Sequence, residues 1–472
     1  MWVASHHRVA RHEPPLHDKR GGPVGGNAVN VTPSGAALAR ASALNLLARL
    51  TSGAATLGLA ILSTHVLDTN GRGIYAILTT WAGIGATVIT GGTTVLAADL
   101  IHRRHEERIL HGATSAIALG SAVVLLPLSL AIALPTSGVA LPALVCTAAL
   151  TVLVTYSGFE MAIAQARGDV LRVSLTDIAM QLFPLLATAA AVILFDHTVT
   201  TLVAAWAAGA LITAAAQFLG AARIGSLIVV RAWGVGVSIM RRSARVALAN
   251  GAGLLCARID VLVVAAVLSA SAAGIYSIPV ALAGNLLLLS RSLLTASYHP
   301  IMTAPEHDVG ARLSTAVRHS VIVVLVGGGL SIPVIAVAAG FIFGEAYSDI
   351  WQPYTLLVLA AACICVVEVL RHYLLTRLER QSEYVVVVTA MLVVNGVLAA
   401  VGAAAFGLVG AAASTTITYA LAALALVALC AREVDMPMRE LAVPRWSDLM
   451  SYWRAARWAL RRRRSATAIA PE

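Results

Sequence analysis

Two long runs without charged residues constrain the fold of this 472-residue chain more than any other feature. Residues 109–159 and 384–431 contain no Asp, Glu, Lys or Arg. A helix needs about 20 residues to cross a hydrocarbon core of ~30 Å, so each run is long enough for two crossings. Charged residues make up 12% of the chain, about half the share in soluble domains. The composition excludes a soluble enzyme, a nucleic-acid-binding protein and a disordered chain.

These runs belong to a pattern of twelve apolar segments, which predicts an all-α integral membrane protein with about 12 transmembrane helices. We expect two six-helix bundles, residues 36–220 and 244–431, joined by a basic cytoplasmic linker at 221–243. Residues 1–35 are polar and lack the apolar core of a signal peptide, which predicts a disordered cytoplasmic extension. Residues 432–472 are expected to form a basic cytoplasmic tail. The apolar segments are 38–62, 74–99, 113–135, 139–165, 174–195, 199–220, 244–269, 274–301, 317–343, 354–376, 384–405 and 407–431.

The distribution of basic residues predicts the orientation of these helices. With both termini in the cytoplasm, 28 of the 33 Lys and Arg residues fall in cytoplasmic segments, and Arg72 alone falls in a segment on the opposite side. This is a strong positive-inside bias, which supports both the orientation and the helix count. It also accounts for the net charge of +10 without a nucleic-acid partner.

The two halves share a short repeat. Leu67 precedes Gly73–Ile77 (GIYAI), and Leu268 precedes Gly274–Ile278 (GIYSI), at an offset of 201 residues. Both copies are predicted to lie on the outer side, at the start of a helix that returns inward. Six helices per half give both halves the same orientation, which predicts a parallel repeat about a pseudo-two-fold axis along the membrane normal.

Arginines inside the predicted helices are the candidates for a binding site, because a charge at the bilayer centre costs about 2.5–3.5 kcal/mol. Arg49 is expected about 16 Å into the first helix and Arg258 about 20 Å into the seventh. Arg291 and Arg371 lie near inner helix ends, where their side chains can also extend to the headgroups. Guanidinium groups bind phosphate in a planar, bidentate way. Arg49, Arg258 and Arg291 are therefore predicted to bind a pyrophosphate.

Three carboxylates inside the predicted helices, Asp260, Glu160 and Glu368, are candidates for an ion-coupling or a structural role. Asp260 follows Arg258 by two residues, so on a continuous helix the two side chains face about 200° apart. We therefore expect that they do not point into one cavity. Glu368 has the spacing of an intrahelical ion pair with Arg371.

Other polar and reactive side chains indicate no site. Asp99 and Asp177 lie at predicted cytoplasmic helix ends and are expected to be solvated. The five cysteines fall inside apolar runs, as small core residues do. The histidines of residues 1–35 have no regular ligand spacing. We predict no metal site, no cofactor and no disulfide framework.

The C-terminal tail carries an apolar stripe with helical spacing beside a group of arginines. This pattern predicts an amphipathic helix on the anionic lipids of the inner leaflet. A docking segment for a cytoplasmic partner is the alternative. The stripe consists of Trp446, Leu449, Met450, Trp453, Ala456 and Leu460, and the arginines are Arg454, Arg457 and Arg461–Arg464.

Three stretches resemble a known family of transporters. Leu67–Tyr75 is similar to its outer loop before helix two, Arg258–Ser277 to its seventh helix and the following turn, and Phe406–Ala412 to the glycine-rich entry of its last helix. Residues 36–431 as a whole resemble a Wzx-type polysaccharide flippase of the multidrug/oligosaccharidyl-lipid/polysaccharide exporter superfamily.

This resemblance implies a bacterial inner-membrane flippase, not an enzyme, that moves a lipid-linked, undecaprenyl-pyrophosphate type of saccharide by alternating access. It implies glycosyltransferases or a polymerase of the same pathway as partners, and basic residues in the cavity, for which Arg49 and Arg258 are candidates. The alternatives are an ion-coupled multidrug exporter of the same superfamily, a membrane glycosyltransferase or polymerase, and a non-transporting scaffold. An exporter of cationic drugs would favour acidic, aromatic-lined pockets, whereas aromatic residues make up 5% of this chain.

Overall fold

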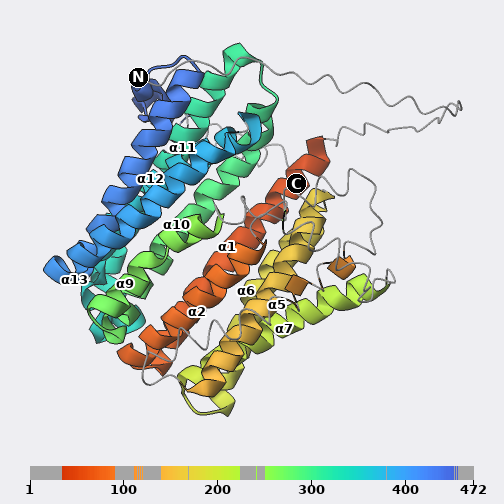
Figure 1. Cartoon of the computed structure of the whole chain (residues 1–472), viewed down its shortest axis with the longest axis vertical. Coiled ribbons are helices and arrows are strands. Elements are labelled where there is room, and N and C mark those ends of the chain that lie inside the picture. Colours follow the sequence, from red (N-terminus) through yellow and green to blue (C-terminus); the bar gives the residue numbers. More distant parts are fainter. Residues whose placement is uncertain are drawn as a thin grey trace, which may run out of the picture. The chain divides into compact units, whose positions relative to one another are not determined.

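The structure is a computed structural model of the chain. It describes residues 35–90, 140–223 and 250–450, except residues 168 and 379, together with a few single positions outside these ranges. The chain divides into two units, Met1–Arg40 and Ala41–Glu472. The second unit contains the helices from the body of α1 onward (Figure 1).

All regular elements of the described residues are helices, which confirms the prediction of an all-α fold. They are α1 (Gly35–Val66), α2 (Thr69–Thr90), α5 (Leu141–Ala166), α6 (Val170–Leu194), α7 (Val199–Arg223), α9 (Ile259–Val267), α10 (Ala270–Met302), α11 (Glu306–Phe343), the 3-10 helix η1 (Glu345–Ile350), α12 (Trp351–His372), the π-helix η2 (Tyr373–Arg377), α13 (Gln381–Glu433) and α14 (Met438–Ala442).

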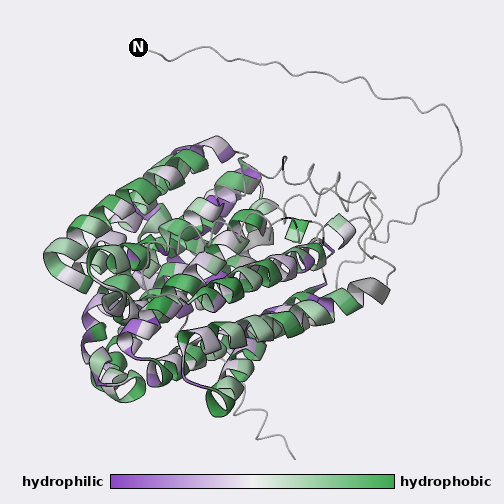
Figure 2. Ribbon diagram, turned by 60° about the horizontal axis from the view of Figure 1, so that its bottom comes forward, coloured by the Kyte–Doolittle hydropathy of each residue, from purple (hydrophilic) through white to green (hydrophobic). Residues whose placement is uncertain are grey.

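Nine of the described helices are long and apolar enough to cross a membrane. A tenth crossing is broken, because Asn250–Cys256 and α9 meet at a bend of 46°. Hydrophobic residues predominate along these helices (Figure 2), and Val337 and Phe341 are 87% and 91% exposed. Such surface is stable only against lipid. The chain is therefore a multi-pass membrane protein.

The longest helix, α13, folds back on itself at Gly407. Gly407 has φ 62° and ψ −141°, a conformation that side-chain-bearing residues rarely adopt. Beyond it, the Ser414 hydroxyl donates to the Leu398 carbonyl oxygen at 2.7 Å, so the two arms of α13 run antiparallel in contact. Gly402 and Gly410 permit this approach, since a Cβ on Gly410 would lie 2.5 Å from the Gly402 carbonyl carbon. α13 thus contains both of the last two predicted helices.

Several predicted segments lie outside the described residues. They are nearly all of the extension at 1–35, most of the predicted helix 113–135, most of the linker at 221–243 and the end of the tail. The number of twelve helices and their division into two bundles stay predictions.

The two copies of the repeat contact each other where α2 and α10 cross. A Cβ on Gly73 would overlap the Ala270 carbonyl oxygen, and a Cβ on Gly274 would overlap the Thr69 carbonyl oxygen. Thr69 and Ala270 are themselves 201 residues apart, so the contact is reciprocal. The Ser271 hydroxyl also donates to Thr69 Oγ1 at 2.7 Å. Reciprocal contacts of this kind are the mark of a local two-fold axis.

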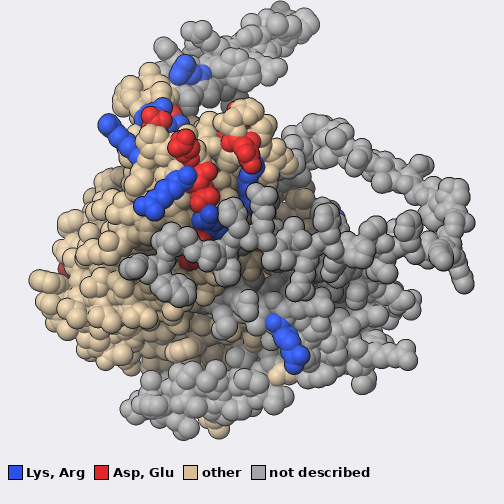
Figure 3. All heavy atoms as spheres, turned by 45° about the horizontal axis from the view of Figure 1, so that its top comes forward, with Lys and Arg blue, Asp and Glu red and all other residues tan. Residues whose placement is uncertain are grey.

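Charged side chains gather in one region of the face that Figure 3 shows. They tie the helix ends of the second half together. The Arg377 guanidinium donates to the carbonyl oxygens of Ile301 and Ala304 at 2.8 and 2.9 Å. Arg380 on the entry to α13 pairs with Glu433 at its end, at 2.8 Å. We call this end of the helices the inner end, following the positive-inside prediction, and the opposite end the outer end.

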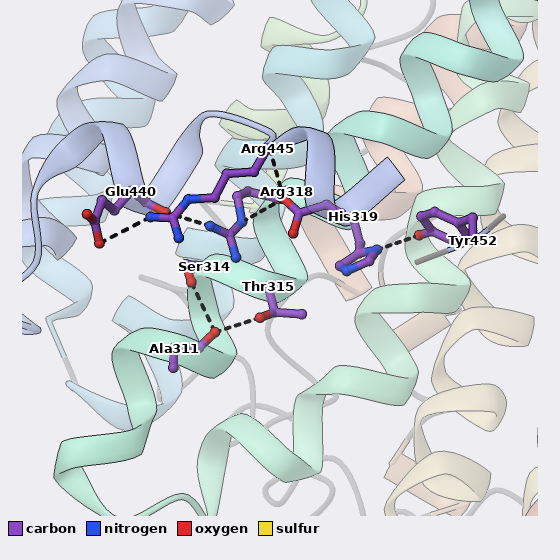
Figure 4. A network of polar contacts seen from close by, with 9 residues as sticks. Ala311, Ser314, Thr315, Arg318, His319, Glu440, Arg445 and Tyr452 are labelled. Carbon is purple, nitrogen blue, oxygen red and sulfur yellow. Dashed lines mark hydrogen bonds and ion pairs between the residues drawn. The ribbon is translucent and has the colours of Figure 1, made fainter. Parts of the chain in front are cut away.

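The beginning of the tail is held against α11 (Figure 4). Arg318 pairs with Asp448 at 3.2 Å, and His319 Nδ1 hydrogen-bonds the Tyr452 hydroxyl at 2.7 Å. Burial and the Asp448 carboxylate raise the pKa of Tyr452, so this hydroxyl keeps its proton. Leu441 is fully buried in the core of the second half. One side of the predicted amphipathic segment therefore contacts protein, whereas Trp446 on it is 75% exposed. The lipid contact stays a prediction.

Candidate functional site

A break in a membrane-spanning helix places Arg258. The backbone of Arg258 leaves the helical region, at φ −133° and ψ −7°, and α9 begins at the next residue. Arg258 lies nine residues from Val267, about 14 Å from the outer end of α9. Broken helices in transporters bring backbone groups and side chains to a substrate near mid-membrane. The break at Arg258 has the position of such a site.

The three predicted arginines lie in one neighbourhood. Arg291 on α10 interacts electrostatically with Arg258 at the break and with Arg49 on α1. Arg49 and Arg258 are half-buried and Arg291 is exposed. We call Arg49, Arg258 and Arg291 the arginine cluster. Three like charges that interact inside membrane-spanning segments repel each other, so the arrangement is favourable only with an anion nearby.

The members of the cluster lie at different depths. Arg49 is 17 residues before Val66, about 26 Å from the outer end of α1. Arg49 is also 14 residues after Gly35, so it lies near the middle of α1. Arg291 is likewise about 32 Å from Ala270, the outer end of α10.

Two carboxylates lie beside the arginine cluster. Asp177 on α6 is half-buried and interacts electrostatically with Arg49 and Arg291. The expectation that Asp177 is solvated at a helix end is therefore wrong, because α6 begins at Val170 and places Asp177 two turns inside. Glu368 on α12 also interacts with Arg291. It forms the intrahelical ion pair with Arg371 at 2.7 Å that its spacing indicates.

Asp260, two residues after Arg258, lies in a buried hydrogen-bond network. Its side chain is 1% exposed and accepts hydrogen bonds from the Val261 backbone N–H at 2.8 Å, the Tyr276 hydroxyl at 3.0 Å and the Thr415 hydroxyl at 3.1 Å. These contacts join α9, α10 and the second arm of α13. The expected angle of 200° between Arg258 and Asp260 does not apply, because the helix is interrupted between them. Asp260 interacts electrostatically with Arg258, although its hydrogen bonds go to Val261, Tyr276 and Thr415.

Glu160 forms a third polar group at the inner end of α5. Its carboxylate lies 2.8 Å from His111 Nδ1 and 3.2 Å from the Arg172 guanidinium, and both Glu160 and His111 are 1% exposed. The sequence reasoning selected Glu160 and missed His111, because nothing in the spacing of 49 residues links the two. Within the described residues, no three His, Cys, Asp or Glu side chains are grouped as a metal site requires.

Comparison with known proteins identifies the fold. No family model and no curated protein matches the chain. Among solved structures, the lipid II flippase MurJ in an inward closed conformation is similar with a TM-score of 0.63, at 12% identity, over 84% of this chain and 89% of MurJ.

Two further structures show the same likeness. A MOP superfamily transporter from Pyrococcus furiosus, described by the reverse polarity of its binding pocket, has a TM-score of 0.62 at 12% identity, over 84% of this chain and 95% of that one. The MATE multidrug transporter DinF-BH, solved as a complex with a small molecule, has a TM-score of 0.60 at 15% identity, again over 84% and 95%. The chain therefore has the all-α fold of the MOP superfamily transporters.

Proposed function

We propose that this protein flips a polyprenyl-pyrophosphate-linked saccharide, with undecaprenol as the carrier, across the cytoplasmic membrane of a bacterium. It is a transporter and not an enzyme, its termini are cytoplasmic, and its cargo enters the synthesis of a surface or extracellular polysaccharide. The observation that carries the proposal is the arginine cluster, whose members come from α1, α10 and the break before α9. The likeness to the lipid II flippase MurJ supports a lipid-linked cargo.

The arginine cluster suits a pyrophosphate in charge and in geometry. Each phosphoryl group of a pyrophosphate can accept two parallel hydrogen bonds from one guanidinium. In the absence of cargo, Asp177 balances Arg49, and Glu368 balances Arg291 and Arg371. The cargo must compete with these carboxylates. This competition lowers the affinity enough to permit release.

The depths of the three arginines suggest a direction of movement. Arg49 and Arg291 lie nearer the inner ends of their helices, where the loaded lipid is made. Arg258 lies about 14 Å from the outer end of α9. Passage of the pyrophosphate from Arg49 to Arg258 moves it toward the outer side. The saccharide accompanies it between the helices, and the polyprenyl chain stays in the bilayer. Glycosyltransferases and a polymerase of the same pathway are the expected partners.

The ion-coupled multidrug exporter is the second candidate, and one observation favours it. Asp260 is a fully buried carboxylate that receives three hydrogen bonds and has no guanidinium within ion-pair distance among the described residues. Such a carboxylate can bind and release a proton as its surroundings change. The likeness to DinF-BH is compatible with this reading. The two candidates differ in the residue whose loss stops transport.

A flipping assay in proteoliposomes tests the proposal. The purified protein is reconstituted with a fluorescent undecaprenyl-pyrophosphate disaccharide, and exposure of the sugar is followed with an impermeant glycosidase. Loss of one charge-assisted phosphate contact of about 1.5–3 kcal/mol predicts roughly a 10- to 100-fold slower rate for Arg258→Gln and for Arg49→Gln. Arg312→Gln is the matched control, because Arg312 is exposed at the inner surface, where it forms an ion pair with Asp308.

The outcomes separate the candidates. Flipping that slows in Arg49→Gln and Arg258→Gln, and not in Arg312→Gln, supports the proposal. Flipping that is the same in all three variants refutes the role of the arginine cluster. The exporter replaces the flippase as the conclusion if two results are found together. The wild type does not flip the lipid-linked disaccharide, and it exports a cationic dye in a proton-dependent way that Asp260→Asn abolishes.

A further inference from the structure

A buried guanidinium at the outer end of α2 has no counter-charge. Arg72 is 6% exposed, and its side chain forms no hydrogen bond and no ion pair with the described residues. Buried ions in proteins are normally paired or hold a ligand, since an unpaired ion strongly disfavours burial. Arg72 is also the arginine that the positive-inside pattern leaves on the outer side. Its burial therefore requires an explanation that the arginine cluster does not supply.

Several polar groups around Arg72 are buried without a hydrogen-bond partner in the described part of the chain. The Arg72 guanidinium carbon lies 5.3 Å from the centre of the Tyr75 ring, and Tyr347 on η1 interacts with the same guanidinium. Tyr75 and Tyr347 are each 3% exposed, and both hydroxyls are buried without a hydrogen-bond partner, as is Arg72 Nε. The nearby Asp68 carboxylate accepts from the Gly71 backbone N–H at 2.8 Å, as a cap of α2.

The second copy of the repeat shows what this neighbourhood lacks. Tyr276 occupies the position of Tyr75, 201 residues later. The Tyr276 hydroxyl donates to the Asp260 carboxylate at 3.0 Å. In the first copy the Tyr75 hydroxyl has no hydrogen-bond partner among the described residues, and the Arg72 guanidinium lies over the ring of the same tyrosine. The charge beside the tyrosine is therefore negative in the second copy and positive in the first. Within the described ranges, the first copy has no acceptor for its tyrosine hydroxyl.

We propose that Arg72, Tyr75 and Tyr347 form a second anion site, at the outer end of α2, that binds a phosphate or pyrophosphate group. The guanidinium provides charge and paired N–H donors, and the two phenols provide one O–H donor each. Tyr75 and Arg72 come from the first half of the chain and Tyr347 from the second, so an anion here links the two halves.

Two sources supply such a group at this side of the membrane. One is the pyrophosphate of the carrier lipid as it leaves, and this source rests on the proposed function. The other is an ordinary phospholipid headgroup of the outer leaflet. The proposal of an anion site does not depend on which source is correct, because an oxyanion from either lipid would pair with the buried donors.

Calorimetric titration of the full chain in phosphatidylcholine nanodiscs with inorganic pyrophosphate tests the site. We expect Arg72→Gln to weaken binding about tenfold or more and Tyr347→Phe by a few-fold, and Arg72→Lys to restore part of the loss. Arg312→Gln is the control. Unchanged binding in both Arg72→Gln and Tyr347→Phe overturns the site. Pyrophosphate should also raise the melting temperature of the wild type and not of Arg72→Gln, whereas a purely structural Arg72 would lower the melting temperature without any anion present.

Arg258→Gln makes this test independent of the proposed function. If Arg72→Gln weakens binding and Arg258→Gln does not, the outer site stands and the arginine cluster fails. If Arg258→Gln alone weakens binding, the outer site fails and the proposed function stands. Competition distinguishes the sources. A phospholipid headgroup is indicated if phosphatidylglycerol in the nanodisc reduces pyrophosphate binding in the wild type but not in Arg72→Gln. The carrier lipid is indicated if only undecaprenyl pyrophosphate competes with pyrophosphate.

Discussion

The crossing of α2 and α10 makes a graded prediction about three glycines. A Cβ on Gly73 would lie 2.5 Å from the Ala270 carbonyl carbon and would overlap its oxygen, and a Cβ on Gly274 would lie 2.8 Å from the Gly73 nitrogen. Ordinary carbon contacts are about 3.5–4.0 Å, so alanine at Gly73 must push the two backbones roughly 1 Å apart. Gly83, further along α2, has nothing within 4 Å of a Cβ. It is the matched control on the same helix.

The magnitude follows from two opposing effects. Alanine in place of glycine favours a helix by up to about 1 kcal/mol, at Gly83 as at Gly73. Overpacking typically destabilises by about 1–3 kcal/mol, and the upper end applies where the obstacle is backbone, which has no other rotamer. We therefore expect Gly73→Ala to lower the free energy of unfolding by about 3 kcal/mol relative to Gly83→Ala. Gly274→Ala should fall between the two.

Unfolding in mixed micelles by titration with sodium dodecyl sulfate, followed by tryptophan fluorescence, measures this difference. Each variant is first shown to elute as a single species. The expected order of unfolding midpoints is Gly83→Ala, then Gly274→Ala, then Gly73→Ala as the lowest. Equal midpoints for Gly73→Ala and Gly83→Ala would refute the reasoning, because they would mean that the crossing has room for a methyl group.

Three other regions make predictions that the same unfolding titration or limited proteolysis can check. Gly410→Ala should destabilise the α13 hairpin by about 1–3 kcal/mol, because its Cβ would overlap the Gly402 backbone. Gly329→Ala is the control, since a Cβ there would have nothing within 4 Å. Equal effects of the two substitutions would contradict the close contact between the arms of α13. Tyr276→Phe should cost about 1.5–3 kcal/mol by removing a hydrogen bond to the buried Asp260 carboxylate, and a neutral result would show that this hydrogen bond adds no net stability. Asp448→Asn should speed tryptic cleavage in the tail by weakening the ion pair with Arg318. Asp196→Asn, on a distant loop, serves as the control. Unchanged cleavage in Asp448→Asn would mean that the apolar contacts of Leu441 are enough to hold the tail.

The sequence predicts the helices well because their apolar runs are long and their loops are short. It places α5, α6 and α7 within a few residues, and it separates the two arms of α13 although no polar loop divides them. The glycine-rich entry at Phe406–Ala412 marks that turn. Hydropathy, however, records only which residues avoid water. It carries no information about the early start of α1 or the break at Arg258.

The candidate site is predictable only in part, for a physical reason. Charges inside apolar segments are conspicuous, so Arg49, Arg258 and Arg291 can be selected from sequence alone. Their partners are not conspicuous. The apolar pattern places Asp177 at a helix end, where a carboxylate is usually solvated, whereas α6 begins two turns earlier; His111 meets Glu160 only through helix packing. Such pairings depend on how helices far apart in the chain pack together, which a hydropathy pattern does not encode.

The repeat shows where prediction from sequence stops. Gly73 and Gly274 are required in both copies, because each helix must approach the backbone of the other at their crossing. The tyrosines that follow them share a position and differ in chemistry, since Tyr276 faces the Asp260 carboxylate and Tyr75 faces the Arg72 guanidinium. The backbone geometry of the crossing is therefore held in common, and the charge beside the tyrosine differs between the halves. A two-fold arrangement of helices can in this way place an acidic group in one half and a basic group at the equivalent place in the other.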